Sequence, residues 1–173
     1  IYYGGFSQYA KVNSDFLVKL PKDLTNKKAM MMGTAGLTAL LCSFAVKAKE
    51  ELLMGSKVKD VLVTGATGGV GSFAVMALSK MGYDVHAVTG KKDKHDYLKK
   101  LGAKNILDRK EFLGESKLLE KGMWDCVVDN VGGEGLTKIL AQTKPGGIVA
   151  LPGNAGGVKI ATNTMPFVIR GVK

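Results

Sequence analysis

The stretch Thr64-Gly65-Ala66-Thr67-Gly68-Gly69-Val70-Gly71 decides the fold. It follows a short apolar run and precedes residues with helical spacing. Against the pattern G-x-G-x-x-G, the glycine positions fall on Ala66, Gly68 and Gly71, so alanine replaces the first glycine. A loop of this kind between a strand and a helix predicts a diphosphate site, because free N–H groups and the helix dipole stabilise negative charge there. A plain glycine-rich turn is the alternative.

Strands and helices alternate regularly around this loop. We expect strands over residues 60–65, 83–89, 105–107, 125–131 and 147–151. We expect helices over residues 70–81, 93–101, 110–121 and 135–143. This order predicts an α/β fold, a doubly wound parallel-sheet Rossmann domain with right-handed crossovers and helices on both faces.

The segments before this domain have a different pattern. Residues 6–20 alternate apolar and polar side chains and end at Pro21, which predicts short strands of another domain. Residues 25–54 are rich in helix formers and predict a helix in two pieces, broken near residues 33–36. We therefore assign residues 1–25 to a remnant of a separate β domain and 26–173 to the Rossmann domain, and we expect both ends to be cut from a longer protein.

Composition excludes several classes of partner. The formal net charge is +10, but the densest lysines, at 91–100, are interleaved with Asp93 and Asp96 and without base-stacking aromatics, so we expect no nucleic-acid partner. Residues 29–46 carry no charge, and a buried core helix explains them, so we expect no membrane association. Cys42 and Cys126 lie in apolar runs and are expected to be buried thiols, which favours a cytoplasmic location.

Two rival phosphate motifs do not fit. A P-loop needs lysine after its last glycine, whereas Gly71 is followed by Ser72. Short-chain dehydrogenases share the pattern Thr-Gly-x-x-x-Gly-x-Gly but use Tyr-x-x-x-Lys, and no tyrosine here has lysine four residues on. The loop is therefore interpreted as a dinucleotide site.

The residues after the second expected strand indicate which dinucleotide binds. NAD enzymes usually carry a carboxylate there for the ribose 2′-hydroxyl. This chain has Thr89, Gly90, Lys91 and Lys92 instead, which suits a 2′-phosphate, so we predict NADP(H) as cofactor with NADPH preferred over NADH. Asp93 is the one nearby carboxylate that opposes this reading, and solvated lysines are the alternative.

Several ordered motifs resemble one family over nearly the whole chain. They are GGFSQY (4–9), GTAGLTAL (33–40), VTGATGGVGS (63–72), VTGK (88–91), DCVVDNVGG (125–133) and MPFVIRGV (165–172). Together they resemble the zinc-independent acryloyl-CoA reductase/quinone oxidoreductase-like branch of the medium-chain dehydrogenase/reductases. The resemblance implies that residues 1–25 come from a GroES-like domain, and that the full-length protein forms a homodimer through the last sheet strand.

The resemblance also implies roles for particular residues. Thr67, Gly68, Gly69 and Val70 would bind the diphosphate, Thr89, Gly90 and Lys91 the 2′-phosphate, and Arg109 would lie near the adenosine. The nicotinamide ribose would lie beside Asn130, Val131 and residues 151–154, among them Leu151, Gly153 and Asn154, and the backbone of Phe167 would approach the nicotinamide. Turn or core packing is the alternative for these later positions. Zinc-dependent relatives have a ligand near Thr34, but residues 30–41 hold no Cys, His, Asp or Glu, so we expect no metal.

The implied reaction is hydride transfer from NADPH to an activated alkene such as an enoyl thioester. No catalytic residue is assigned, because in relatives these groups come largely from the other domain. Quinone reduction and a non-catalytic, NADPH-binding structural role are the alternatives.

Overall fold

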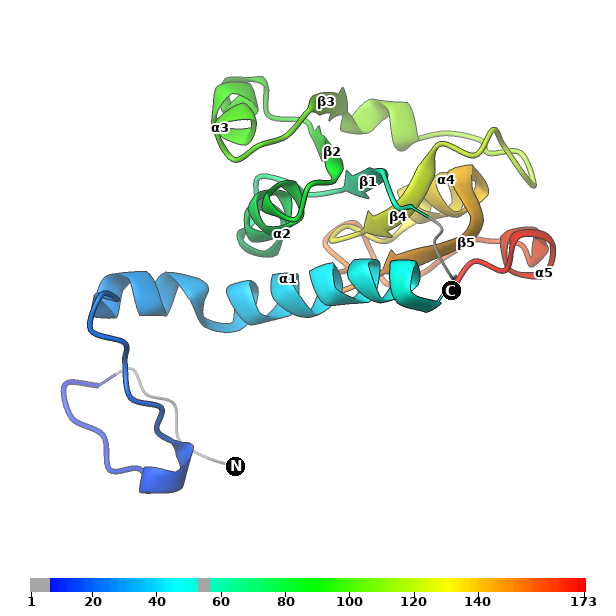
Figure 1. Cartoon of the computed structure of the whole chain (residues 1–173). Coiled ribbons are helices and arrows are strands. Elements are labelled where there is room, and N and C mark those ends of the chain that lie inside the picture. Colours follow the sequence, from blue (N-terminus) through cyan, green and yellow to red (C-terminus); the bar gives the residue numbers. More distant parts are fainter. Residues whose placement is uncertain (1–6, 53–56) are drawn as a thin grey trace. The chain divides into compact units, whose positions relative to one another are not determined.

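The computed structural model describes residues 7–52 and 57–173, which form two compact units, 1–32 and 33–173 (Figure 1). In the first unit, residues 7–20 are exposed and contain only a short 3-10 helix, η1 (Ser14–Phe16). The prediction of strands over 6–20 is therefore wrong for the described part. A strand needs a neighbour to pair its N–H and C=O groups, and the described residues of this unit supply no such neighbour.

A long helix, α1 (Asn26–Leu52), spans the boundary of the two units. At Gly33 its backbone has φ 0° and ψ −134°, outside the helical region, which confirms the predicted break near residues 33–36. The predicted end near Met54 lies outside the described residues. By length and composition alone this helix could cross a membrane, a test that core helices also pass. Its residues Ala39, Cys42 and Val46 lie buried in the core of the second unit.

The second unit is built on a five-stranded, wholly parallel sheet of order β3-β2-β1-β4-β5 (Figure 1). The strands are β1 (Asp60–Val63), β2 (Asp84–Thr89), β3 (Asn105–Asp108), β4 (Trp124–Val128) and β5 (Thr143–Ala150). The chain builds outward from β1 in one direction and then, from β4, in the other. The doubly wound α/β prediction is thus confirmed, with a topological switch point between β1 and β4.

Helices cover both faces of this sheet. They are α2 (Gly69–Lys80), α3 (His95–Lys100), α4 (Glu134–Gln142) and α5 (Met165–Arg170), with 3-10 helices η2 (Lys92–Lys94) and η3 (Arg109–Phe112). Alternate side chains of β1 point to opposite faces: Val61 and Val63 pack in the cluster with α1, α2 and α3, and Leu62 packs in the cluster with α4. Both faces are therefore apolar, as a parallel sheet requires.

The predicted helix over residues 110–121 is wrong. Asp108 and Glu111 form a capping box that starts η3, but the turn stops at Phe112. Gly114 then has φ +95°, which a helix cannot contain, and Leu113 and Leu118 are exposed. The segment therefore has no buried apolar face to stabilise a helix. The other predicted strands and helices of this unit occur, with ends that differ by up to four residues. The short helix α5 was not predicted.

The start of α2 lies very close to the end of β1. A Cβ atom at Gly71 would lie 2.3 Å from the carbonyl oxygen of Gly65 and 2.8 Å from the Cα of Ala66. Because both neighbours are backbone, no rotamer change can relieve the contact. Glycine at 71 therefore lets the helix begin directly beyond the strand.

Replacing Gly71 by alanine should lower the free energy of unfolding by about 1–3 kcal/mol, because the methyl group overpacks a backbone contact. Gly135→Ala in α4 is the matched control, since the nearest atom to its new Cβ is 3.6 Å away. That variant should be neutral or slightly more stable. Urea unfolding measures both, and equal stabilities would contradict the close approach of α2 to β1.

Charged and polar side chains join four strands, β1, β2, β4 and β5, at the amino edge of the sheet. Lys144 Nζ lies 3.2 Å from Asp60 Oδ2 and 3.1 Å from Asp125 Oδ2, and His86 Nε2 lies 3.0 Å from Asp60 Oδ1. Burial raises the pKa of the Asp60 carboxyl, but the hydrogen bonds with His86 and Lys144 outweigh it and lower this pKa below the ordinary value. The native state therefore favours the ionised carboxylate.

The stability that these pairs contribute should depend on pH. A lowered folded pKa means that the contribution of Asp60 is complete above its unfolded pKa of about 4 and is lost as the pH falls through the folded value. Lys144→Met should therefore be less stable than the wild type at pH 7, by up to about 1 kcal/mol. Thermal unfolding between pH 7 and pH 2.5 should show the difference shrinking below about pH 4; a constant difference would contradict it.

Candidate functional site

A cleft of about 700 Å³ lies at the carboxyl edge of the sheet. It is formed by the loops that follow β1, β2, β3 and β4, with the start of α4 and two residues beyond β5. Those loops contribute Thr64, Gly65 and Thr67; Thr89, Gly90 and Lys91; Arg109, Phe112 and Leu113; and Asp129, Val131 and Gly132. The switch point between β1 and β4 is where ligands bind in sheets of this kind.

The glycine loop turns sharply at the floor of this cleft. Gly65 has φ +56°, and the amide of Gly68 donates to its carbonyl at 2.9 Å. The amide of Ala66 donates to the Val88 carbonyl at 3.2 Å, so this amide is committed to the fold. The first i→i−4 bond of α2 runs from Ser72 N to Gly68 O. The amides of residues 69–71 precede it and have no carbonyl four residues back inside the helix.

The end of β2 carries no acidic side chain. Thr89 is buried, and its Oγ1 accepts a hydrogen bond from the Lys91 amide at 3.1 Å. A Cβ atom at Gly90 would lie 2.9 Å from Arg109 Nε, so the guanidinium lies directly over this glycine. Lys91 and Arg109 thus bring two cations to one end of the cleft.

A hydrogen-bonded network ties the ends of β1 and β4 together. The Asp129 carboxylate is fully buried and accepts from the Thr64 hydroxyl and from the amides of Val131 and Gly132, both at 3.1 Å. Thr64 Oγ1 in turn accepts from the Asn130 amide at 3.0 Å, and Asn130 Nδ2 donates to the Thr64 carbonyl at 2.7 Å. The loop after β4 is therefore held rigidly against the loop after β1.

One atom of this network lacks a partner. Among the described residues, Asn130 Oδ1 is a buried acceptor without a hydrogen bond. Because its amide nitrogen is already bonded to Thr64, the oxygen cannot be satisfied by turning the amide around. A buried orphan acceptor is costly, so a ligand that donates a hydrogen bond here would be favoured.

The structure brings most of the predicted site residues together, but not all. Thr67, Thr89, Gly90, Lys91, Arg109 and Val131 line the cleft. Ala66, Gly68, Gly69, Val70 and Gly71 form the adjoining turn and helix start. Gly153 packs on the Asn130 carbonyl, where a Cβ would approach to 2.5 Å, and Asn154 lies beside it. Leu151 and Phe167 are about half exposed and do not line the cleft.

Thr64 and Asp129 are functional candidates that the motif reading did not single out. Both lie at the last position of an apolar strand run, where a polar residue in a fully buried sheet needs a specific partner. That pattern was visible in DVLVT and DCVVD. The sequence does not show that the ends of β1 and β4 meet, because this depends on the order of the strands in the sheet.

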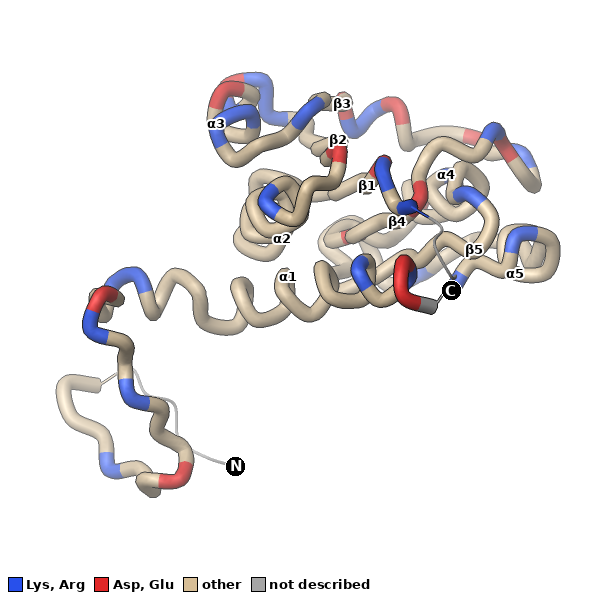
Figure 2. The backbone as a smooth tube through the Cα atoms, viewed as in Figure 1, with Lys and Arg blue, Asp and Glu red and all other residues tan. Residues whose placement is uncertain are grey.

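The described residues offer neither a metal cluster nor an exposed thiol. In residues 7–52 and 57–173, no group of three or more His, Cys, Asp or Glu is placed to hold a metal ion. Cys42 and Cys126 are buried free thiols, as predicted, and burial raises the pKa of both. Lysine and acidic residues alternate around α3, and Figure 2 shows no long run of one sign there.

Comparison with known proteins places this chain among oxidoreductases. Residues 69–173 match the family described as zinc-binding dehydrogenase. The chain is 47% identical over 172 residues to a probable acrylyl-CoA reductase, AcuI, of Escherichia coli, covering 99% of this chain and 52% of that protein. It is 46% identical over 170 residues to a putative quinone oxidoreductase, YhfP, of Bacillus subtilis, covering 98% and 51%. The chain thus spans about half the length of the curated relatives it matches.

Two solved structures have the same architecture. The yhdH oxidoreductase of Salmonella enterica, in complex with NADP, matches with a TM-score of 0.88 at 48% identity, over 98% of this chain and 51% of that one. The B. subtilis yhfP structure, with NAD bound, matches with a TM-score of 0.87 at 45% identity, over the same shares. Both relatives therefore hold a nicotinamide dinucleotide.

Removing the Thr64 hydroxyl should weaken the network at the cleft floor. Thr64→Val keeps the shape but leaves the Asn130 amide and one Asp129 oxygen short of a partner, so we expect a loss of about 1–3 kcal/mol in the free energy of unfolding. Thr64→Ser keeps the hydroxyl and should lose clearly less. Chemical unfolding of the two variants checks this, and a valine variant as stable as the serine variant would rule out the network.

Proposed function

The chain belongs to the zinc-binding dehydrogenase family of the medium-chain dehydrogenase/reductases, and on that premise we propose that it is the NADP(H)-binding part of an oxidoreductase that reduces an activated carbon–carbon double bond. The observation that carries the proposal is the cleft at the switch point, with helix amides at one side and two cations at another.

The start of α2 suits a diphosphate. Gly68 and Gly69 are exposed and present no side chain, so a phosphate can approach the amides of residues 69–71. The helix dipole adds to the attraction. The hydroxyl of Thr67, which lines the cleft, is a further donor.

The end of β2 favours the phosphorylated cofactor. Lys91 and the Arg109 guanidinium supply positive charge where an NAD-specific site would carry a carboxylate. The two acids that line the cleft, Asp129 and Glu134, come from the end of β4 and the start of α4. Neither acid comes from the β2 end, where the 2′-phosphate would bind, and the three donors to Asp129 partly offset its negative charge.

The far end of the cleft suits the nicotinamide riboside. Val131 and Gly132 line the cleft here, and a small shift of the neighbouring Asn130 side chain, which does not line it, would let the buried Oδ1 accept from a ribose hydroxyl. Thr64 and Asp129 act as positioning residues, because they hold the Asn130 backbone and side chain in place. By holding Asn130 in place, Thr64 and Asp129 would fix the orientation of the nicotinamide ring without contacting the substrate.

NADPH, when bound, supplies the hydride for the reaction. The chain would bind it, orient it at the carboxyl edge and exclude water from that face. We propose an enoyl thioester such as acryloyl-CoA as substrate, supported by the name of the E. coli relative. No catalytic residue is assigned here, and we propose that the half of the relatives that this chain does not span provides the groups that contact the substrate.

Quinone reduction is the second candidate, because the B. subtilis relative at 46% identity is named as a putative quinone oxidoreductase. We further propose a cytoplasmic homodimer that binds neither nucleic acid nor membrane. The dimer proposal is supported by the edge of the sheet: Lys173 pairs with β5 through Val149 N to Lys173 O at 2.8 Å and Lys173 N to Gly147 O at 2.9 Å.

Reversing the charge at Lys91 should change cofactor preference. Lys91→Glu should weaken NADPH binding by about tenfold or more, since a charge-assisted hydrogen bond contributes about 1.5–3 kcal/mol, and should change NADH binding much less. Lys100→Glu, at the end of α3 and outside the cleft, controls for net charge. Calorimetric titration of both variants with both dinucleotides is the measurement; equal losses for NADPH and NADH would refute the 2′-phosphate site.

The substrate class can be separated from the cofactor site. A chain extended to the full length of the relatives should oxidise NADPH with acryloyl-CoA faster than with a quinone, followed by absorbance at 340 nm. The 173-residue chain alone should bind NADPH without turnover. A faster quinone reaction would favour the second candidate, and turnover by the chain alone would show that it holds catalytic groups.

A further inference from the structure

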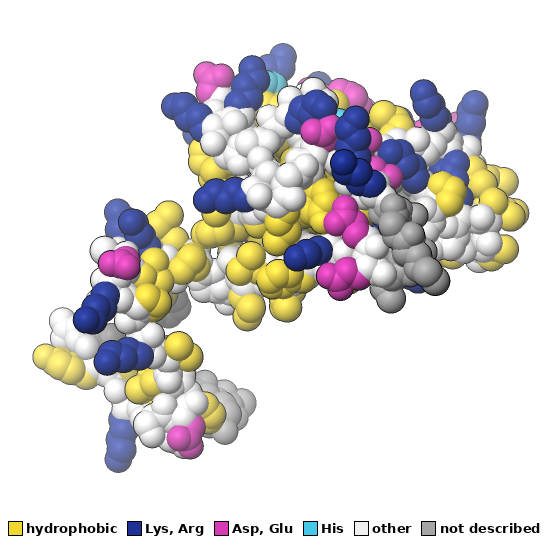
Figure 3. All heavy atoms as spheres, viewed as in Figure 1, with side chains coloured by type: hydrophobic (Ala, Val, Ile, Leu, Met, Phe, Trp, Pro, Cys, Tyr) yellow, Lys and Arg dark blue, Asp and Glu magenta, His cyan; other side chains and the backbone are white. Residues whose placement is uncertain are grey.

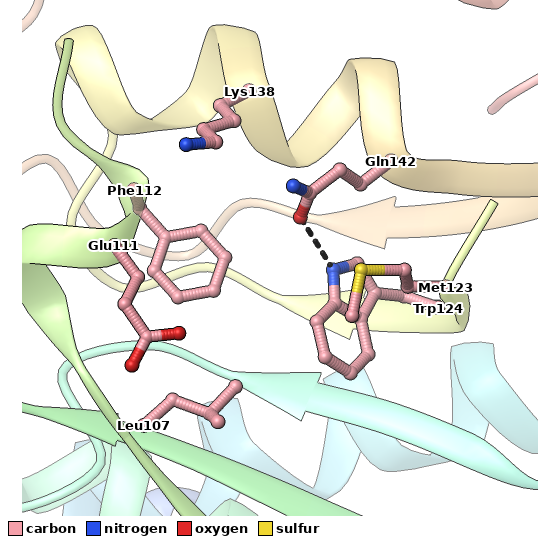
Figure 4. A pocket seen from close by; sticks show the side chains of 7 residues that line it. All are labelled: Leu107, Glu111, Phe112, Met123, Trp124, Lys138 and Gln142. Atoms are coloured by element: carbon pink, nitrogen blue, oxygen red, sulfur yellow. Dashed lines mark hydrogen bonds between the residues drawn. The ribbon is translucent and has the colours of Figure 1, made fainter. Parts of the chain in front are cut away.

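A second hollow, of about 410 Å³, opens on the sheet face that α4 covers (Figure 4). It lies between η3, the start of β4 and α4, beside the irregular segment where a helix was predicted. The buried Phe112 lines both this hollow and the cofactor cleft, whereas Trp124 lines the hollow but not the cleft. The two spaces are therefore neighbours separated by one aromatic side chain.

Aromatic side chains form the walls of this hollow. Phe112 and Trp124 are 6% and 3% exposed, and Met123 stands at the mouth (Figure 4). The Trp124 indole is held in place, because its Nε1 donates to Gln142 Oε1 at 3.2 Å and its ring packs against the His86 ring with centroids 5.0 Å apart. Rigid aromatic walls with a thioether beside them favour a flat aromatic ligand.

Two charged side chains line the hollow, Glu111 from η3 and Lys138 from α4, and they lie on opposite sides of the Phe112 ring (Figure 4). Gln142 Nε2 donates to Glu120 Oε2 at 2.9 Å, and Glu111 Oε1 accepts from the Asp108 amide at 3.2 Å. Lys138, which projects from α4 into the view of Figure 4, forms no ion pair within 4.0 Å among the described residues. Its charge acts on Glu120, whose pKa is lowered first by the hydrogen bond with Gln142 and also by Lys138.

From these contacts we propose that the hollow binds a small aromatic carboxylate. The ring would lie against Phe112 and Trp124, and the carboxylate would pair with Lys138. A neutral ring would leave the ammonium without a partner, and the ligand carboxylate would point toward Lys138 and away from Glu111, which lies on the other side of Phe112 (Figure 4). The site is separate from the dinucleotide cleft and does not depend on the function proposed above.

The chain has one tryptophan, so its fluorescence reports on this hollow directly. We would titrate the protein with 3-iodobenzoate, a heavy-atom quencher, and with its neutral isostere 3-iodobenzamide, exciting at 295 nm. The carboxylate should quench Trp124 saturably and bind at least about fivefold more tightly than the amide, because only the carboxylate can pair with Lys138. Linear quenching without saturation, or equal affinities, would overturn the proposal.

Two variants locate the bound probe. Lys138→Gln should remove the preference for the carboxylate, whereas Lys110→Gln, an exposed lysine that does not line the hollow, should keep it. Circular dichroism establishes whether each variant is folded. If a variant does not fold, the relative affinities of 3-iodobenzoate and 3-iodobenzamide for the wild type still test the proposal. Saturating adenosine 2′,5′-bisphosphate should leave the quenching unchanged; displacement of the probe would place it in the cofactor cleft and overturn the proposal.

Discussion

The close approach of α2 to β1 is the constraint on which the rest of the unit depends. Because Gly71 has no side chain, the helix begins directly beyond the strand, with Gly71 against the Gly65 carbonyl. The first amides of α2 then face the carboxyl edge of the sheet, where the loops after β1, β2 and β4 converge. A longer connection would move those amides away from the cleft, and the site would lose the donors that can bind a diphosphate.

The Thr64–Asp129 pair extends this constraint across the switch point. A fully buried carboxylate bonded to a hydroxyl and two amides holds the loop after β4 against the glycine loop. The cleft thus has a rigid floor. Elsewhere on the chain, two helices carry exposed apolar side chains. Figure 3 shows such side chains over α1 and α5, where Leu37, Leu41, Phe44 and Val168 are more than half exposed.

Local signals explain what the sequence could and could not predict. The glycine loop, the apolar strands and the end of β2 could be predicted, because each depends on the identity of residues that are close together in the sequence. The helix expected over 110–121 does not form. Gly114 has a positive φ, and Leu118 is exposed, so the segment has no apolar face to bury. The strands expected over residues 6–20 failed because pairing partners are not encoded locally. The Thr64–Asp129 pair depends on strand order, which joins residues 65 positions apart.

The central claim is that backbone amides at the start of α2 bind the diphosphate of NADPH. Titration of the ¹⁵N-labelled chain with NADPH, followed by amide chemical shifts, tests this most directly. The account predicts that the amides of Gly69, Val70 and Gly71 show large, saturable shifts, together with those of Gly90 and Lys91. A folded chain whose α2 amides do not respond, or whose shifts lie only outside this cleft, would contradict it.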